Sequence, residues 1–207
     1  MLDCATSVSQ RGKIEVYARL DKEIPEGWVI GKDGEYRTDS LQILSALVEG
    51  DAALVPLGGV GEQTGGYKGY GYAAVVEVLS AALQGGAFLK GLLGFDKNGN
   101  RVPCRLGHFF IALDVEAFID LESFKKTTGE IIRSLRNSRK VPDAVQIYTA
   151  GEKGHLAWLE RKDKGAKVDE VLREQILELK KEYGLSNYHF PFEQVILSTV
   201  YRVALLT

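Results

Sequence analysis

The chain has 207 residues, a length that suits one domain or one and a half. Its 26 lysines and arginines against 28 acidic residues give a formal net charge of −2, which argues against a nucleic-acid-binding surface because such a surface needs a basic excess. Hydrophobic residues make up 45% of the chain, as in soluble globular proteins, and no window approaches the ~18 apolar residues of a membrane span. We therefore expect neither nucleic acid nor a membrane as a partner.

The cysteines and histidines predict no metal site. Cys4 and Cys104 fit neither zinc-binding nor redox spacing, and a reduced cytoplasmic setting is the expectation for so few thiols. The first residues contain no apolar core of the length of a secretory signal peptide. His108, His155 and His189 belong to no metal-binding or nucleophile pattern, and we interpret all three as structural.

In the first part of the chain, short helical and extended patterns alternate with loops. Ile14, Tyr17 and Ala18 have helical spacing, which favours a helix over residues 11–20, although Ile14 and Val16 would also suit a strand. We then expect a loop over residues 23–39, a short helical or irregular segment over 40–50 and a β-like run over 52–59 that ends at a glycine pair.

A glycine-rich stretch, GGYKGYG over residues 65–71, comes directly before an apolar segment. We predict a helix from about Tyr70 to Leu83, with Glu77 as its only ionisable group, and a helix that is apolar nearly all round is expected to be buried. Exposed backbone N–H groups, the helix N-terminus and the charge of Lys68 together favour an anion site, for a diphosphate or a carboxylate. A loop that merely allows close helix packing fits the composition equally well. The spacing is neither a P-loop nor the common dinucleotide fingerprint.

The second part of the chain predicts two strands among several helices. GHFFIALDV over residues 107–115 has the continuous apolar pattern of a central strand. Residues 120–138 predict an amphipathic helix, and residues 143–152 a strand that leads into a Gly-Glu turn. Two further helices are expected to stop at Gly165 and Gly184. This order favours an α/β or α+β layered domain.

Two other turns carry polar groups. Residues 3–7, DCATS, offer a carboxylate and two hydroxyls that could hold ribose hydroxyls or phosphate oxygens, although a self-capping turn is the more ordinary interpretation. Residues 150–154, AGEKG, place Glu152 at a helix start, where a carboxylate also interacts favourably with the helix dipole without any ligand.

Six stretches occur together in one order: DCATSVSQRGKIEVYAR, IPEGWVIGKDGEYRTD, VPLGG, GYKGYGYAAVVEVLSAALQGG, GHFFIALDVEAF and AGE. In this combination the chain resembles the malate/L-lactate dehydrogenase family of NAD(P)-dependent oxidoreductases, from Asp3 to about Gly184. The resemblance implies a non-Rossmann α/β (α+β layered) fold with a mixed sheet flanked by helices. It also implies a homodimer and hydride exchange between NAD or NADP and a 2-keto acid or 2-hydroxy acid.

The resemblance further implies that three turns hold the cofactor. Their residues in this chain are Asp3, Ala5, Thr6 and Ser7, then Lys68 and Gly69, then Gly151 and Glu152. Ala150 stands where the family usually has proline.

Family members are much longer, and the resemblance covers only their second half. Their first half carries the histidine expected to act as acid/base and an arginine expected to hold the substrate carboxylate. Lys13 is the one residue here that we nominate as catalytic, with an exposed surface lysine as the alternative. Three hypotheses follow: an oxidoreductase completed by an N-terminal half that is supplied separately, a catalytically silent dinucleotide-binding module, or a remnant that only folds.

The expected organisation has three parts. Residues 1–150 form a partial NAD(P)-binding α/β domain, residues 151–187 a C-terminal helical segment, and residues 188–207 an atypical tail. The apolar sequence of this tail, together with the surface left bare by the first half, predicts self-association of the chain.

Overall fold

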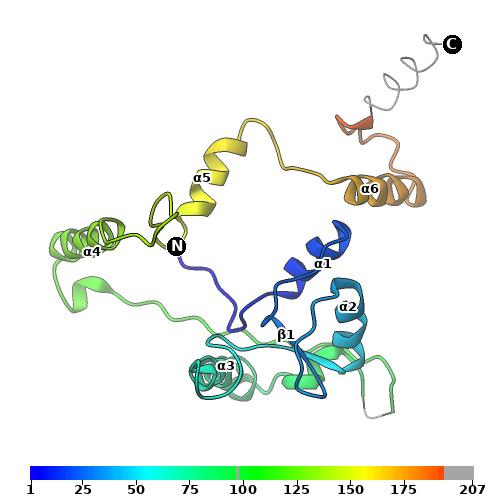
Figure 1. Cartoon of the computed structure of the whole chain (residues 1–207), viewed down its shortest axis with the longest axis horizontal. Helices are drawn as coiled ribbons and strands as arrows, with labels where there is room; N and C mark the ends of the chain where they lie inside the picture. Colours follow the sequence, from blue (N-terminus) through cyan, green and yellow to red (C-terminus); the bar gives the residue numbers. More distant parts are fainter. Residues whose placement is uncertain (97, 194–207) are drawn as a thin grey trace, which may run out of the picture. The chain divides into compact units, whose positions relative to one another are not determined.

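The computed structural model describes residues 1–96 and 98–193 (Figure 1). The elements in chain order are α1 (Arg11–Arg19), β1 (Val29–Gly31), α2 (Ser40–Glu49), β2 (Ala52–Leu54), α3 (Gly66–Ser80), η1 (Ala82–Gln84), η2 (Leu89–Leu93), η3 (Val115–Ala117), α4 (Leu121–Arg136), α5 (Glu152–Arg161) and α6 (Glu170–Glu182). The chain divides into two compact units, Met1–Ala157 and Trp158–Thr207.

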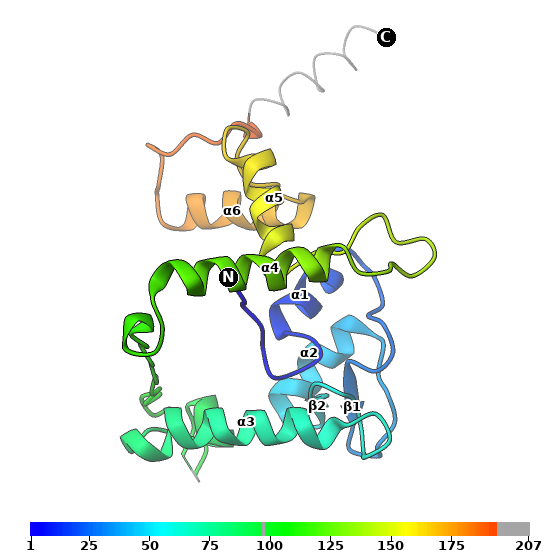
Figure 2. The same cartoon turned by 90° about the vertical axis from the view of Figure 1, so that its left-hand side faces the viewer.

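A small core in the first unit joins α1, α2 and the two strands, which lie together in Figure 2. Its buried members are Ile14, Ile24, Val29 and Ile43. The helix expected over residues 11–20 is confirmed as α1, because Ile14 points into this core while the polar residues of its turn face water. The expectation of a plain loop over residues 23–39 is wrong in part, since that segment contains β1.

The sheet of the described chain has two antiparallel strands, in which Val29 pairs with Leu54 and Gly31 with Ala52. The β-like run and the helical segment before it are both confirmed, as β2 and α2. Asp39 caps α2 by accepting hydrogen bonds from the backbone N–H groups of Leu41 and Gln42, at 3.0 Å each. This cap fixes where the helix begins.

Helix α3 begins at Gly66, a turn earlier than the sequence predicted. Gly66 and Gly69 are its buried residues, and they face the segment of residues 55–59. A Cβ atom on Gly69 would overlap the backbone of Leu57, and one on Gly66 would overlap the carbonyl of Gly59. The glycines are therefore required by close packing of the helix, which was one of the two interpretations of this stretch.

The expectation that α3 is buried is wrong for the described chain. Tyr70, Val75 and Val78 are exposed, and so are Phe124 and Leu135 among the apolar residues of α4. The apolar pattern is present, but no layer within residues 1–96 and 98–193 covers these faces. Burial of a helix needs a partner surface, which its own sequence cannot supply.

Neither expected strand of the second part is formed. Residues 107–114 have no regular secondary structure before η3 begins at Val115, and no strand begins in residues 143–152 either. A strand exists only where a neighbour accepts and donates its ladder of hydrogen bonds. The described chain offers neither segment such a neighbour.

The second unit contains the end of α5, helix α6 and the beginning of the tail. Asp169 caps α6 through the backbone N–H of Leu172, at 2.8 Å, and the helix ends before Gly184, as expected. Lys180 on α6 forms an ion pair of 2.8 Å with Glu193. The tail predicted over residues 188–207 is described only to residue 193, so its apolar part lies outside the described residues.

A pair of glycine substitutions in α3 tests the close packing. We expect Gly69→Ala to lower the free energy of unfolding by about 1–3 kcal/mol, because the added methyl overlaps the backbone of Leu57. Gly71→Ala is the matched control: nothing lies within 4 Å of its Cβ position, so alanine should stabilise the helix by about 0.5–1 kcal/mol. Urea unfolding followed by tryptophan fluorescence measures both. Equal effects of the two substitutions would contradict this packing.

Candidate functional site

The first turn, residues 3–7, is tied to the segment of residues 55–59. Leu57 N–H donates to the carbonyl of Thr6 at 3.0 Å, and Val8 N–H donates to Val55 at 2.8 Å. The hydroxyl of Ser7 donates to the carbonyl of Ser9 at 2.6 Å, so the self-capping interpretation of this turn is seen in the structure. Asp3 is exposed.

The second turn, residues 65–69, contacts the same segment from α3. Gly66 and Gly69 lie against the backbone of residues 57–59. Residues 55–59 therefore bring together two turns that are sixty residues apart in the sequence. Both belong to the set that the family resemblance assigns to the cofactor.

Lys68 places a cation at the N-terminus of α3. Its side chain is exposed and folds back over Gly65, with Nζ 5.8 Å from the centroid of the Tyr67 ring. Among the described residues no carboxylate forms an ion pair with it. Gly66 N–H donates to Gly61 at 3.1 Å and Lys68 N–H donates to Gly65 at 3.0 Å. The charge of Lys68 and the partial positive charge of the helix N-terminus are therefore what this turn offers to a phosphate.

The third turn, residues 149–152, lies against the start of the chain. A Cβ atom on Gly151 would overlap the backbone of Met1, two residues before Asp3. The three turns that sequence comparison linked to one cofactor are thus all held within the first unit, by backbone contacts.

Glu152 is held by three hydrogen bonds to its Oε2 atom. Thr149 donates both its backbone N–H and its hydroxyl, at 2.9 Å each, and Arg136 donates Nε at 3.0 Å. These donors favour the charged carboxylate, so the pKa of Glu152 lies below its ordinary value, chiefly because of the Thr149 bonds. The T-x-x-E spacing has the sequence signature of a capping box and would have identified Thr149 from the sequence, although α5 begins at Glu152 and the Thr149 hydroxyl donates to the Glu152 carboxylate. Nothing local pointed to Arg136.

Lys13, the nominated catalytic residue, lies on α1 with its Nζ 4.6 Å from the centroid of the Trp28 ring. The same ring meets Tyr17 edge-on, with centroids 5.5 Å apart. This is a cation–π contact on an exposed side chain, the geometry of the surface-lysine alternative. A catalytic role for Lys13 stays a prediction.

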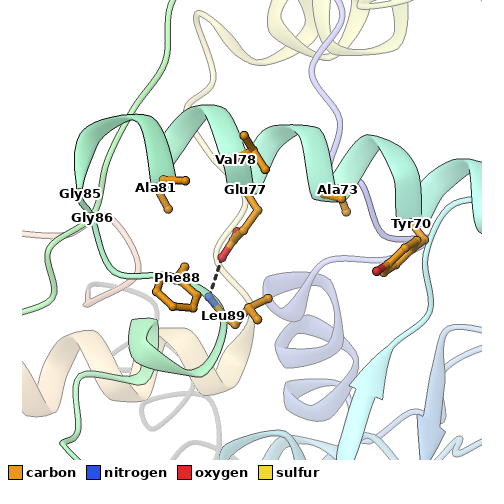
Figure 3. A pocket seen from close by; sticks show the side chains of 11 residues that line it. Tyr70, Ala73, Glu77, Val78, Ala81, Gly85, Gly86, Phe88 and Leu89 are labelled. Carbon is orange, nitrogen blue, oxygen red and sulfur yellow. Dashed lines mark hydrogen bonds between the residues drawn. The ribbon is translucent and has the colours of Figure 1, made fainter.

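An apolar groove of about 760 Å³ runs along α3 and residues 81–89 (Figure 3). Tyr70, Ala73, Val78 and Phe88 line it. Glu77 is its one acidic side chain, and the carboxylate accepts a hydrogen bond of 2.5 Å from the backbone N–H of Leu89. The groove therefore offers a surface to apolar groups rather than acid–base chemistry.

The described residues contain neither a metal-binding cluster nor a membrane-spanning helix. No three histidine, cysteine or acidic side chains in this part of the chain gather where they could hold a metal ion. No helix in it has the length and apolar composition to cross a membrane.

The family model for malate/L-lactate dehydrogenase matches residues 1–177. The chain is 40% identical over 185 residues to a malate dehydrogenase of Pyrococcus horikoshii, covering 89% of this chain and 49% of that protein. It is 34% identical over 188 residues to an L-sulfolactate dehydrogenase of Methanocaldococcus jannaschii, covering 89% and 48%. The chain spans about half the length of the curated relatives it matches.

A solved structure shows the same fold. The crystal structure of malate dehydrogenase from Entamoeba histolytica is 37% identical, superimposes with a TM-score of 0.81, and is matched over 92% of this chain and 51% of that chain. From the extent of the family match and this structural similarity, the chain belongs to the malate/L-lactate dehydrogenase family, of which it represents a C-terminal portion.

Proposed function

We propose that this chain is the part of a 2-hydroxy acid oxidoreductase that binds NAD or NADP, and that it works in hydride exchange with a 2-keto acid. The observation that carries the proposal is the arrangement of the three turns, two of them on residues 55–59 and the third on Met1, with Lys68 at the start of α3. Membership of the family supports it. The relatives are named for malate and L-sulfolactate, both 2-hydroxy acids.

The residues present fit such a cofactor. Lys68 and the N-terminus of α3 suit a diphosphate, and the carboxylate of Asp3 with the hydroxyl of Thr6 suits ribose hydroxyls. Gly69 and Gly151 allow the two other turns to pack against the backbone of Leu57 and Met1, and Ala5 and Ser7 lie beside Thr6. Glu152 holds the third turn in place through Thr149. When bound there, the nicotinamide ring supplies or accepts the hydride.

The chemistry on the substrate needs two further groups: a proton donor near the developing alkoxide, and a cation for the carboxylate. The ammonium of Lys13 lies over Trp28. We therefore assign both groups to the N-terminal half of the family's fold. The alternative function is a catalytically silent dinucleotide-binding module, and it is favoured by the position of Lys13 and by the half-length match to the relatives.

The finer organisation belongs to the same proposal. Residues 1–150 serve as the NAD(P)-binding domain of a non-Rossmann fold with a mixed sheet, and residues 151–187 as a helical segment. The proposal also includes a cytoplasmic location and a homodimer, and the exposed apolar residues of α4 support the homodimer.

Replacing Lys68 tests the anion site. We expect Lys68→Ala to weaken binding of NADH or NADPH by ~1.5–3 kcal/mol, the contribution of a hydrogen bond to a charged group. Lys126→Ala, on the exposed surface of α4, is the control and should leave the affinity unchanged. Isothermal titration with each dinucleotide measures both. Equal affinity of the Lys68 variant and the parent chain would remove Lys68 from the site.

The third turn predicts an acid-dependent loss of stability. Because the folded pKa of Glu152 lies below its ordinary value, its contribution is present above the unfolded pKa of about 4.3. It is lost as the pH falls through the lower, folded pKa. Glu152→Gln should therefore flatten the stability profile below about pH 5. Urea unfolding across this range checks it, with Glu130→Gln on the exposed face of α4 as control. An identical slope for parent and Glu152 variant would contradict the capping role.

An activity assay tests the division of labour between the halves. We expect the chain alone to consume NADH or NADPH poorly with any of a panel of 2-keto acids, since a positioned general acid contributes roughly 10²–10⁴-fold. Turnover should appear when the histidine-bearing N-terminal segment of a relative is supplied. Robust turnover by the chain alone would place the proton donor within this chain.

A further inference from the structure

Residues 109–113 form an exposed segment whose backbone groups lack hydrogen-bond partners within the described chain. Phe110, Ile111 and Leu113 are 86%, 71% and 75% exposed. In the part of the chain that the structure describes, no backbone N–H or carbonyl of these five residues takes part in a hydrogen bond. Five apolar residues in succession are the pattern of a strand buried on both faces, which in a sheet has a neighbour on each edge.

The start of this segment is anchored on the end of α3. Gly107 lies against the carbonyl of Ser80, where a Cβ atom would overlap it. The amide of Gln84 accepts a hydrogen bond of 3.1 Å from His108 N–H and donates one to the His108 carbonyl. Gln84 thus gives His108 the pair of hydrogen bonds that a neighbouring strand would give. The residues that follow are in position to continue such a ladder.

The same region contains the apolar groove of α3. Gly86, on the wall of the groove, lies close to the carbonyl of Arg105 and the backbone of Gly107. The groove (Figure 3) therefore lies next to the chain just before the unpaired segment, and both present apolar side chains. Exposed apolar side chains that gather in one region mark a protein interface.

We infer that residues 109–113 are a central β-strand whose neighbours come from the half of the family's fold that this chain does not span, and that this half also covers the α3 groove. The inference rests on the proposed function, which assigns that half to the same enzyme. A second copy of the chain, paired across a two-fold axis, would supply a neighbour on only one edge of the strand. The relatives are about twice as long as their matched part, so a polypeptide of equal size is available to supply both edges and a cover.

Hydrogen exchange read by mass spectrometry tests the inference on the full chain. The probe is the segment of Pyrococcus horikoshii malate dehydrogenase that precedes the part matched by this chain. Alone, the amides of residues 109–113 should exchange at rates close to those of an unstructured peptide. With saturating probe, their exchange should slow by about 100-fold or more, as in a hydrogen-bonded strand.

Two exposed positions give a matched pair of variants. Ile111 and Val141 are both β-branched and are 71% and 72% exposed, so an aspartate at either should leave the isolated chain folded, which circular dichroism verifies. Ile111→Asp should abolish the probe-dependent protection, because it places a charge inside a central strand. Val141→Asp should retain it.

Two results would overturn the inference. One is exchange at residues 109–113 that the probe does not slow. The other is protection already present in the chain alone that rises with its concentration, which would make a second copy the occupant. Dinucleotide affinity, measured by titration of the chain without probe, reports separately on the proposed function. Its loss would leave the exchange result standing.

Discussion

The close approach of helix α3 to residues 55–59 is the contact on which the candidate site depends. It exists because Gly66 and Gly69 have no side chains, so the helix backbone meets the backbone of Leu57 and Gly59 directly. Leu57 also donates its N–H to Thr6. One short segment thus fixes the first turn and the start of α3 at once, and any side chain at position 69 would separate them.

This contact also positions the positive charges of the site. The N-terminus of α3 carries a partial positive charge, and Lys68 adds a full one at the same place. The third turn instead carries a negative charge, the carboxylate of Glu152, which must be held in place. Thr149 and Arg136 do this by donating three hydrogen bonds to Glu152. The site is therefore formed mainly by backbone groups and by side chains that hold the turns in place. Few of its side chains could transfer a proton, which agrees with a role in binding.

The small core explains why so much of the apolar pattern is exposed. Ile14, Ile24, Val29 and Ile43 hold α1, α2 and the two strands together, whereas α3 and residues 109–113 present apolar groups to water. The chain matches about half of its relatives' length, which fits the proposal that further polypeptide covers these surfaces.

Local patterns in the sequence determined the helices and the identity of the turns. The spacing around Ile14 predicted α1, the cap at Asp39 sets α2, and the six stretches in order predicted the family. The residues of the three turns also came from the sequence, as did the closeness of α3 to its neighbour as one of two interpretations. These are properties of residues near one another in the chain, where side-chain size, backbone freedom and capping decide the outcome.

Only the tertiary structure decided what depends on partners distant in the chain. It showed that residues 55–59 join two of the turns and that Met1 meets Gly151, that Arg136 reaches Glu152, and that Lys13 lies over Trp28. It also showed that residues 107–115 are not a strand and that α3 is not buried in the described chain. A strand and a buried helix are each defined by a neighbouring surface, and the pattern of one segment states only its capacity for burial, not whether the neighbour is present.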